Sequence, residues 1–233
     1  MDDAVRLRST VCLLGRFPAL AGVDLTVTRG ETLLVRGANG AGKTTLLRAL
    51  AGLVPVVEGH AEVLGCDLRR DRRVVRRRVG LLGHGAALYD DLTVADNLRF
   101  WARAGRARGA DLPGAMARFG LDGRLADVLA ARLSAGQRRR AALAVLVARA
   151  PELWLLDEPH AGLDAAGRDV LDDLVREVTA AGSTVVLASH ELDRAATLAT
   201  RSVTLAGGRF TGDVPPWPDA VQGPAPQEPV HVA

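Results

Sequence analysis

The stretch GANGAGKTT, residues 37–45, combines the residue types that bind a phosphate chain. Gly37, Gly42, Lys43 and Thr44 match the pattern G-x-x-x-x-G-K-[ST], in which glycine lets backbone N–H groups point at an anion. Lys43 is the only lysine among 30 lysine and arginine residues. A compact ammonium fits between phosphate oxygens, where a planar guanidinium is too wide. The stretch therefore predicts a nucleoside triphosphate site, with the Thr44 hydroxyl as a ligand of Mg²⁺.

The whole loop is expected to contact the nucleotide, and ATP with Mg²⁺ is the expected ligand. The predicted contacts are Gly37, Asn39, Gly40, Ala41, Gly42, Lys43, Thr44 and Thr45. The alternative is a glycine-rich turn before an ordinary helix. Apolar LLV before the loop and TTLLRALAGL after it supply the strand and the helix that a phosphate loop requires, and they argue against that alternative.

Two neighbouring carboxylates follow an apolar stretch in LWLLDEP, residues 153–159. The end of a buried strand opens toward the ligand crevice in sheets of this kind. Asp157 is expected to hold Mg²⁺, directly or through water, and Glu158 to polarise an attacking water. Taken alone, the pair is equally well explained as an acidic turn. The phosphate loop makes the catalytic interpretation the stronger one.

Strands and helices alternate along most of the chain, and this order positions the polar residues at strand ends. Strands are expected within residues 5–36, in a hairpin at 56–65, in VGLLG, ELWLLDEP and STVVLASH, and in a final pair in SVTLAGGRF. Helices are expected after the phosphate loop, in AAGRDVLDDLVREVTAAG and in ELDRAATLA. This alternation predicts an α/β fold with a parallel sheet and right-handed crossovers.

Composition suggests the domain limits. Residues 94–150 are rich in Ala, Leu and Arg with helical periodicity, and we expect a helical subdomain over about 86–150. Six prolines between residues 215 and 229 predict a disordered tail over 214–233. The folded domain is therefore expected to cover residues 1–213.

Composition also limits the classes of function. Aromatic residues make up 3 % of the chain and the net charge is +3, so no nucleic-acid partner is expected. Cys12 and Cys66 lack metal-ligand spacing and are expected to be reduced, as in a cytoplasmic protein. The sequence shows neither a signal peptide nor an apolar run of membrane-spanning length, so a membrane permease would be another chain.

Three further motifs occur in a fixed order. LSAGQRRRAALA at 133–144, AGLD at 161–164 and SH at 189–190 resemble the signature motif, the D-loop and the switch histidine of ABC-type ATPases. The resemblance covers roughly residues 5–212. It implies an α/β fold: a P-loop NTPase core with a parallel sheet, an N-terminal antiparallel β subdomain and a helical subdomain that carries the signature. It also implies ATP hydrolysis, with Lys43, Glu158 and His190 as catalytic residues.

The start of the signature has a physical logic of its own. Ser134 is a good N-cap, and Gly136 leaves backbone N–H groups open at a helix start, which makes a second anion site. From the sequence alone, an ordinary capped helix is the simpler explanation, just as His190 is explained by local hydrogen bonds at a strand end. The resemblance implies that Ser134, Gly136 and Gln137 cover ATP bound to a second subunit. The dimer is then head-to-tail, most simply a homodimer, around two ATP molecules.

Two positions depart from the common pattern of the family. Its glutamine after the VGLL-type strand falls on His84, whose neutral imidazole can still contact water or metal. Phe17 stands where the family has an aromatic residue that stacks on adenine, and it is equally well explained as a core residue. The arginine run at 69–78 is explained first as a solvated helix face, second as a contact with anionic lipid or a partner near the membrane, and third as a nucleic-acid contact.

Taken together, the resemblance implies the ATP-hydrolysing subunit of an ABC transporter, peripheral on the inner face of the cell membrane. It drives a transmembrane permease on another chain, which the family contacts near the helical subdomain and His84. LGHGAALYDDLTVADNLRFWARA and LGRFPALAGVDL resemble the ATPase subunit of the haem exporter of cytochrome c maturation. The alternatives are a soluble ABC ATPase without a transport role, such as part of an Fe–S assembly scaffold, and a small-molecule kinase. A kinase would leave LSAGQ and AGLD unexplained.

Overall fold

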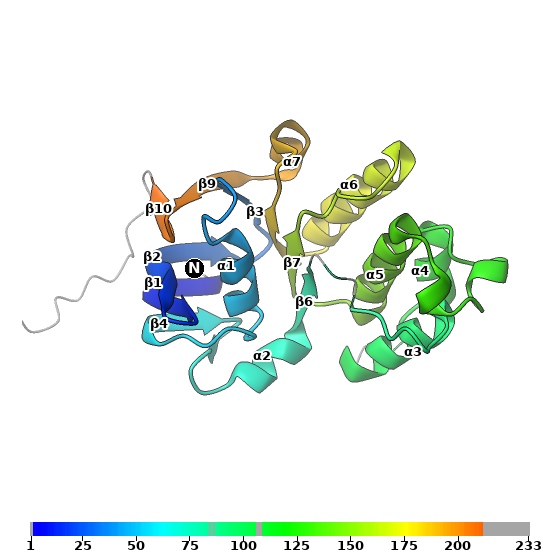
Figure 1. The fold of residues 1–233 in the computed structure, drawn as a ribbon, viewed down its shortest axis with the longest axis horizontal. Coiled ribbons are helices and arrows are strands. Elements are labelled where there is room, and N and C mark those ends of the chain that lie inside the picture. The colour runs from blue at the N-terminus through cyan, green and yellow to red at the C-terminus, as the bar shows by residue number, and fades with distance from the viewer. Residues whose placement is uncertain (1, 84, 86, 106–108, 212–233) are drawn as a thin grey trace, which may run out of the picture.

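The computed structural model describes residues 2–83, 85, 87–105 and 109–211, which form two sheets and the helices around them (Figure 1). One sheet is antiparallel in the order β2-β1-β4-β5, and the other has the order β10-β9-β3-β8-β7-β6. The antiparallel strands are β1 (Asp3–Leu14), β2 (Phe17–Thr28), β4 (Glu58–Val63) and β5 (Cys66–Asp67). Those of the second sheet are β3 (Thr32–Arg36), β6 (Val79–Leu82), β7 (Leu153–Asp157), β8 (Thr184–Ala188), β9 (Arg201–Ala206) and β10 (Arg209–Thr211).

The second sheet is parallel from β9 to β6, and only its edge strand β10 runs antiparallel to its neighbour. The helices are α1 (Lys43–Leu50), α2 (Arg72–Arg78), α3 (Val94–Gly105), α4 (Leu112–Arg118), α5 (Ala135–Arg149), α6 (Ala165–Ala180) and α7 (Leu192–Leu198). Figure 1 shows α3, α4 and α5 gathered at one end of the molecule, with β1, β2 and β4 at the other end and the parallel sheet between them. The predicted α/β fold with these parts is confirmed.

Two apolar cores lie on opposite faces of the parallel sheet. Successive side chains of a strand point to opposite faces, and both faces of β7 are apolar. Leu153 and Leu155 pack into the core that also holds α1 and the antiparallel sheet. Trp154 and Leu156 pack into the core built with α3, α4, α5 and α6. Because β7 is buried on both sides, its position is set by packing and its carboxyl end is held rigidly.

The boundaries differ from the sequence-based expectation at two places. The hairpin of β4 and β5 spans 58–67 instead of 56–65, because its turn lies at residues 64–65. Strand β2 begins at Phe17, although the sequence pattern predicts its strand only in VDLTVT at residues 23–28, since residues 17–22 continue the antiparallel ladder with β1. Phe17 is 80 % exposed, so its interpretation as a core residue is wrong.

The arginine run at 69–78 is a solvated face only in part. Arg76 donates to the Gly52 carbonyl at 2.8 Å, and Arg78 donates to the Leu64 carbonyl at 2.7 Å. Arg73 and Arg77 are exposed. Helix α2 therefore uses some of its arginines to bind the core domain and turns the others toward solvent. No helix in the described parts of the chain has both the length and the apolarity needed to cross a membrane. The predicted tail at 214–233 lies outside the described residues.

Candidate active site

The strand order brings the predicted site residues to one edge of the sheet. Strands β3, β8 and β7 are neighbours and run parallel, so their carboxyl ends coincide. Ala188 at the end of β8 pairs with Val35 on one side and with Asp157 on the other. The phosphate loop follows β3, the acid pair ends β7, and His190 follows β8. Crossover connections thus unite three motifs that are far apart in sequence: Thr44 and Asp157 are separated by 113 residues, and Glu158 and His190 by 32.

These ends surround a pocket of about 260 Å³. It is lined by Leu14, Ala19, Asn39, Gly40, Ala41, Gly42, Lys43, Thr44, Thr45, Asp157, Glu158 and His190. Among the predicted nucleotide contacts of the same loop, only Gly37 lies outside this lining. Ser134, Gly136 and Gln137 do not line it either, which is compatible with a role toward another subunit.

Two loop glycines are required by packing as well as by any ligand. A Cβ on Gly37 would lie 2.2 Å from the Leu205 carbonyl oxygen, and one on Gly42 would lie 2.6 Å from the Ala19 oxygen. Both residues also have positive φ, at 149° and 108°. The loop is therefore pressed between β9 and β2, and a side chain at either position would push it out of place.

Lys43 is almost fully buried, and its ammonium is held by the loop itself. Nζ donates to the carbonyl of Gly37 at 2.6 Å and to that of Ala38 at 3.0 Å. An ammonium has three N–H donors, so one remains for a phosphate oxygen even with both carbonyl bonds kept. The two bonds orient Nζ along the loop before any nucleotide binds.

The two residues predicted to hold Mg²⁺ are in direct contact. The Thr44 hydroxyl donates to Asp157 Oδ2 at 2.8 Å. A hydroxyl oxygen beside a carboxylate is the hard donor set that Mg²⁺ prefers, and in nucleotide sites phosphates and water supply the remaining ligands. The donor set therefore fits a Mg²⁺ that arrives with a nucleotide.

Glu158 and His190 both line the pocket and contact each other directly. The His190 backbone N–H donates to Glu158 Oε2 at 3.0 Å, and His190 Nε2 lies 3.3 Å from Oε1. Glu158 has φ +47°, a left-handed conformation that costs a non-glycine residue about 1–3 kcal/mol. Such strain persists only where the surroundings hold it, and the Glu158 N–H is indeed bound to the Ala188 carbonyl at 2.8 Å.

The signature forms the start of α5 as a capping box. Ser134 Oγ accepts the Gln137 N–H at 3.2 Å, and Gln137 Oε1 accepts the Ser134 N–H at 2.9 Å. Each side chain uses an acceptor here, so the Ser134 hydroxyl proton and the Gln137 amide protons stay free to donate. A second pocket, about 470 Å³, extends from this helix start to Glu158.

Comparison with known proteins identifies this arrangement. Residues 20–161 match the model of the protein family described as ABC transporter. The chain belongs to the ABC transporter family. It is an ABC ATPase, which binds and hydrolyses ATP.

The relatives of this ABC ATPase include named export proteins. It is 42 % identical to the cytochrome c biogenesis ATP-binding export protein CcmA of Paramagnetospirillum magneticum over 81 % of this chain and 88 % of that protein. It is 40 % identical to the daunorubicin resistance ATP-binding protein DrrA3 of Streptomyces coeruleorubidus over 91 % of this chain and 68 % of that protein.

Solved structures show the same fold. The ATP-binding subunit of an ABC transporter superposes with a TM-score of 0.83 at 26 % identity, covering 90 % of this chain and 88 % of the other. The dimeric structure of MJ0796, a bacterial ABC transporter cassette, superposes with a TM-score of 0.77 at 25 % identity, covering 88 % and 96 %.

In this ABC ATPase, sequence reasoning missed Arg139. Its buried guanidinium donates to the carbonyls of Gly83 at 2.7 Å, Asp157 at 2.9 Å and Glu158 at 2.5 Å. Burial lowers the pKa of Arg139, while the carboxylates of Asp157 and Glu158 oppose that shift. The sequence does contain a pattern that indicates the burial of Arg139. Helical spacing places residue 139 on the same apolar face as Ala142, Leu143 and Leu146. Arg139 thereby binds the signature helix α5 to the turn that carries Glu158.

Two other predicted residues stay undecided. Phe17 is exposed and pairs with Leu14, which lines the pocket, but it does not line the pocket itself. Its stacking on adenine therefore stays a prediction. His84, the replacement for the family glutamine, lies outside the described residues.

Proposed function

We propose that this chain is the ATPase subunit of an export system for cytochrome c biogenesis. The named relatives support this, because the match spans most of the length of both proteins. The observation that carries the catalytic part is the single pocket that joins Lys43, Thr44, Asp157, Glu158 and His190.

Each residue of the pocket has a role in the proposed reaction. The Lys43 ammonium and the loop N–H groups bind the phosphates, and Thr44 with Asp157 would hold Mg²⁺, which neutralises phosphate charge when bound. Glu158 accepts a proton from the attacking water, and the His190 imidazole positions the γ-phosphate. In the proposed dimer, Ser134, Gly136 and Gln137 of each subunit donate to the ATP of the other.

The test is the variant Glu158→Gln, which keeps the shape of the side chain but cannot accept a proton. We expect it to bind ATP with near-normal affinity, to hydrolyse it at least about a hundredfold more slowly, and to accumulate as a dimer on sizing with ATP. Normal turnover, or a variant that stays monomeric with ATP, would contradict the proposal.

The proposed contact for the membrane partner is an aromatic cluster on the helical end of the molecule. Tyr89 and Phe100 are 44 % and 43 % exposed, and their ring centroids are 4.8 Å apart. Trp101 lies 5.4 Å from Phe100 and beneath the Arg149 guanidinium. Buried Asn97 fixes the preceding loop by bonding the N–H and the carbonyl of Tyr89. In a chain with 3 % aromatic residues, this rigid exposed cluster is suited to bind an apolar protein segment.

Phe100→Asp tests this contact. We expect the variant to hydrolyse ATP normally but to lose the membrane protein that co-purifies with the wild-type chain. Leu53→Asp is the matched control, because Leu53 is 50 % exposed but follows α1 and is not part of the helices α3, α4 and α5. Retention of the membrane protein by Phe100→Asp would contradict the proposed contact.

The identity of the membrane protein that co-purifies with this chain also tests which cargo is exported. We propose haem export, a homodimer and a position at the inner face of the cell membrane, where the exposed arginines of α2 suit anionic head groups. The similarity to a daunorubicin resistance protein gives drug export as a second candidate, although the chain spans only 68 % of that protein. A partner that binds haem favours the first function, and a partner that confers drug resistance favours the second.

A further inference from the structure

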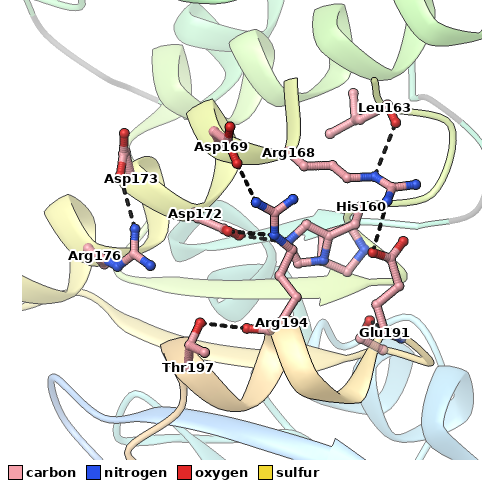
Figure 2. Close-up of polar contacts among 12 residues, drawn as sticks. His160, Leu163, Arg168, Asp169, Asp172, Asp173, Arg176, Glu191, Arg194 and Thr197 are labelled. Atoms are coloured by element: carbon pink, nitrogen blue, oxygen red, sulfur yellow. Dashed lines mark hydrogen bonds and ion pairs between the residues drawn. The ribbon is translucent and has the colours of Figure 1, made fainter. Parts of the chain in front are cut away.

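A buried histidine lies two residues after Glu158. His160 is 1 % exposed, and its Nε2 lies 2.7 Å from Oδ1 of Asp172 on α6, itself 5 % exposed (Figure 2). Asp172 Oδ2 in turn lies 2.8 Å from Nε of Arg194 on α7. Arg194 also pairs with Asp169, one helical turn earlier on α6. A series of polar side-chain contacts thus connects three segments: the loop that follows β7, helix α6 and helix α7.

The geometry sets the proton on one ring nitrogen. A carboxylate with Arg194 on its other oxygen is an acceptor, so His160 Nε2 carries a hydrogen. Nδ1 is buried and has no hydrogen-bond partner among the described residues. Burying an imidazole and a carboxylate here costs desolvation that an apolar pair would avoid. A requirement for one fixed geometry explains their presence better than stability does.

A second contact joins the same elements independently. Arg168 on α6 donates from Nε to the Leu163 carbonyl at 3.2 Å, and its guanidinium lies 3.3 Å from Glu191 (Figure 2). Leu163 ends the loop that His160 begins, and Glu191 follows His190. Helix α6 therefore holds both ends of the loop after Glu158 and also the segment that carries His190.

The loop that is held in this way is strained at its start. Glu158 has φ +47°, and the Ala161 N–H closes a turn on the Glu158 carbonyl at 3.2 Å. Strain of this kind needs anchors on both sides. Arg139 supplies one by binding the Asp157 and Glu158 carbonyls, and the His160 side chain supplies the other.

We propose that His160, Asp172 and Arg194 form a positioning unit that keeps Glu158 and His190 in a fixed relation. None of the three lines the nucleotide pocket, so ATP binding does not depend on the unit. Hydrolysis does depend on it, because hydrolysis requires Glu158 and His190 in the correct position. The inference rests on the roles proposed above for Glu158 and His190. Asp172 and Arg194 act by holding His160, and His160 acts by holding the turn.

The test compares His160→Met with His160→Gln. Methionine fills the space without an N–H, whereas the glutamine amide places an N–H near the position of Nε2. We expect His160→Met to lower kcat between about ten- and a hundredfold with KM and ATP affinity unchanged, because small displacements of reacting groups cost this much. His160→Gln should restore most of kcat.

Arg194→Met provides a second route if His160→Met does not fold. It should also lower kcat at constant KM, and where both variants fold, the double variant should lose little more than His160→Met alone. Normal kcat in the folded single variants overturns the proposal. So does a loss of ATP affinity equal to the loss of kcat, or a His160→Gln variant as slow as His160→Met.

Glu158→Gln, measured in parallel, distinguishes a failure of the proposed positioning unit from a failure of the proposed role of Glu158. Slow hydrolysis by Glu158→Gln with normal turnover by His160→Met overturns only the positioning unit. Normal turnover by Glu158→Gln overturns the role of Glu158 itself.

Discussion

Lys43 and Arg139 are both buried cations near the acid pair, but neither position would accept the other residue type. The Lys43 ammonium fits inside a loop whose carbonyls lie 2.6 and 3.0 Å from Nζ. The Arg139 guanidinium is planar and forked, and it spans carbonyls from two different strand ends. The shape of the cation, more than its charge, decides which residue serves at each position.

Lys43→Ala should abolish detectable ATP binding, because the pocket loses its buried ammonium. Lys43→Arg keeps the charge but not the shape, and it should bind ATP at least about tenfold more weakly than wild type. Titration with a fluorescent ATP analogue measures both. Affinity close to wild type for the alanine variant would refute the role of Lys43.

Arg139→Met should destabilise the protein by about 1–3 kcal/mol, because buried carbonyls lose their donor. Urea unfolding measures the change. The matched control is Arg140→Met, which should stay within about 0.5 kcal/mol of wild type. Within the described ranges, the hydrogen bond of Arg140 is a 3.5 Å contact with the Phe119 carbonyl. Equal stability of the two variants would show that the Arg139 bonds contribute nothing.

At the scale of elements, Glu152 joins three segments at the start of β7. Arg78, the last residue of α2, donates to its two oxygens at 2.6 and 2.7 Å. Arg29, just after β2, lies 3.5 Å away. The hydrogen bond from Arg78 lowers the pKa of Glu152, burial opposes this, and Arg29 lowers the pKa further.

This shift makes stability depend on pH in a defined direction. A depressed carboxyl pKa stabilises the fold above the ordinary value of 4.5, and the contribution is lost as pH falls through the lower folded value. Glu152→Gln should therefore lower the urea midpoint at about pH 7, with the difference from wild type shrinking toward about pH 3. The effect is modest, because the side chain is 45 % exposed. A difference independent of pH would contradict this account.

At the scale of the whole molecule, the two anion-binding helix starts lie in different pockets. The start of α1 lines the pocket of Lys43, and the start of α5 lines the pocket beyond Glu158. The start of α5 is absent from the lining of the Lys43 pocket, although Glu158 borders both pockets. We propose that a second subunit supplies its own α5 start to the nucleotide bound in the Lys43 pocket.

Gly136→Asp tests this completion, because it places a negative charge where the ATP of the other subunit is proposed to lie. In the Glu158→Gln background it should bind ATP normally and stay monomeric on sizing. Gly136→Ala is the matched control with the same added Cβ, 3.2 Å from the Gly162 oxygen, and it should still dimerise. Dimerisation of the aspartate variant would place the interface elsewhere.

The sequence by itself determined the α/β class, and it predicted the chemistry of the phosphate loop and of the acid pair. These features depend on local spacing and on the apolar periods of strands and helices, which are written in consecutive residues. It did not reveal Arg139 as an anchor, the burial of His160 with Asp172 and Arg194, or the exposure of Phe17.

Only the tertiary structure decided those points. Arg139 reaches carbonyls 18 and 56 residues away, and Arg194 meets α6 only because α7 packs beside it. Contacts of this kind depend on the strand order β3-β8-β7 and on which face each helix covers. Crossover connections set both, and no short run of residues encodes them.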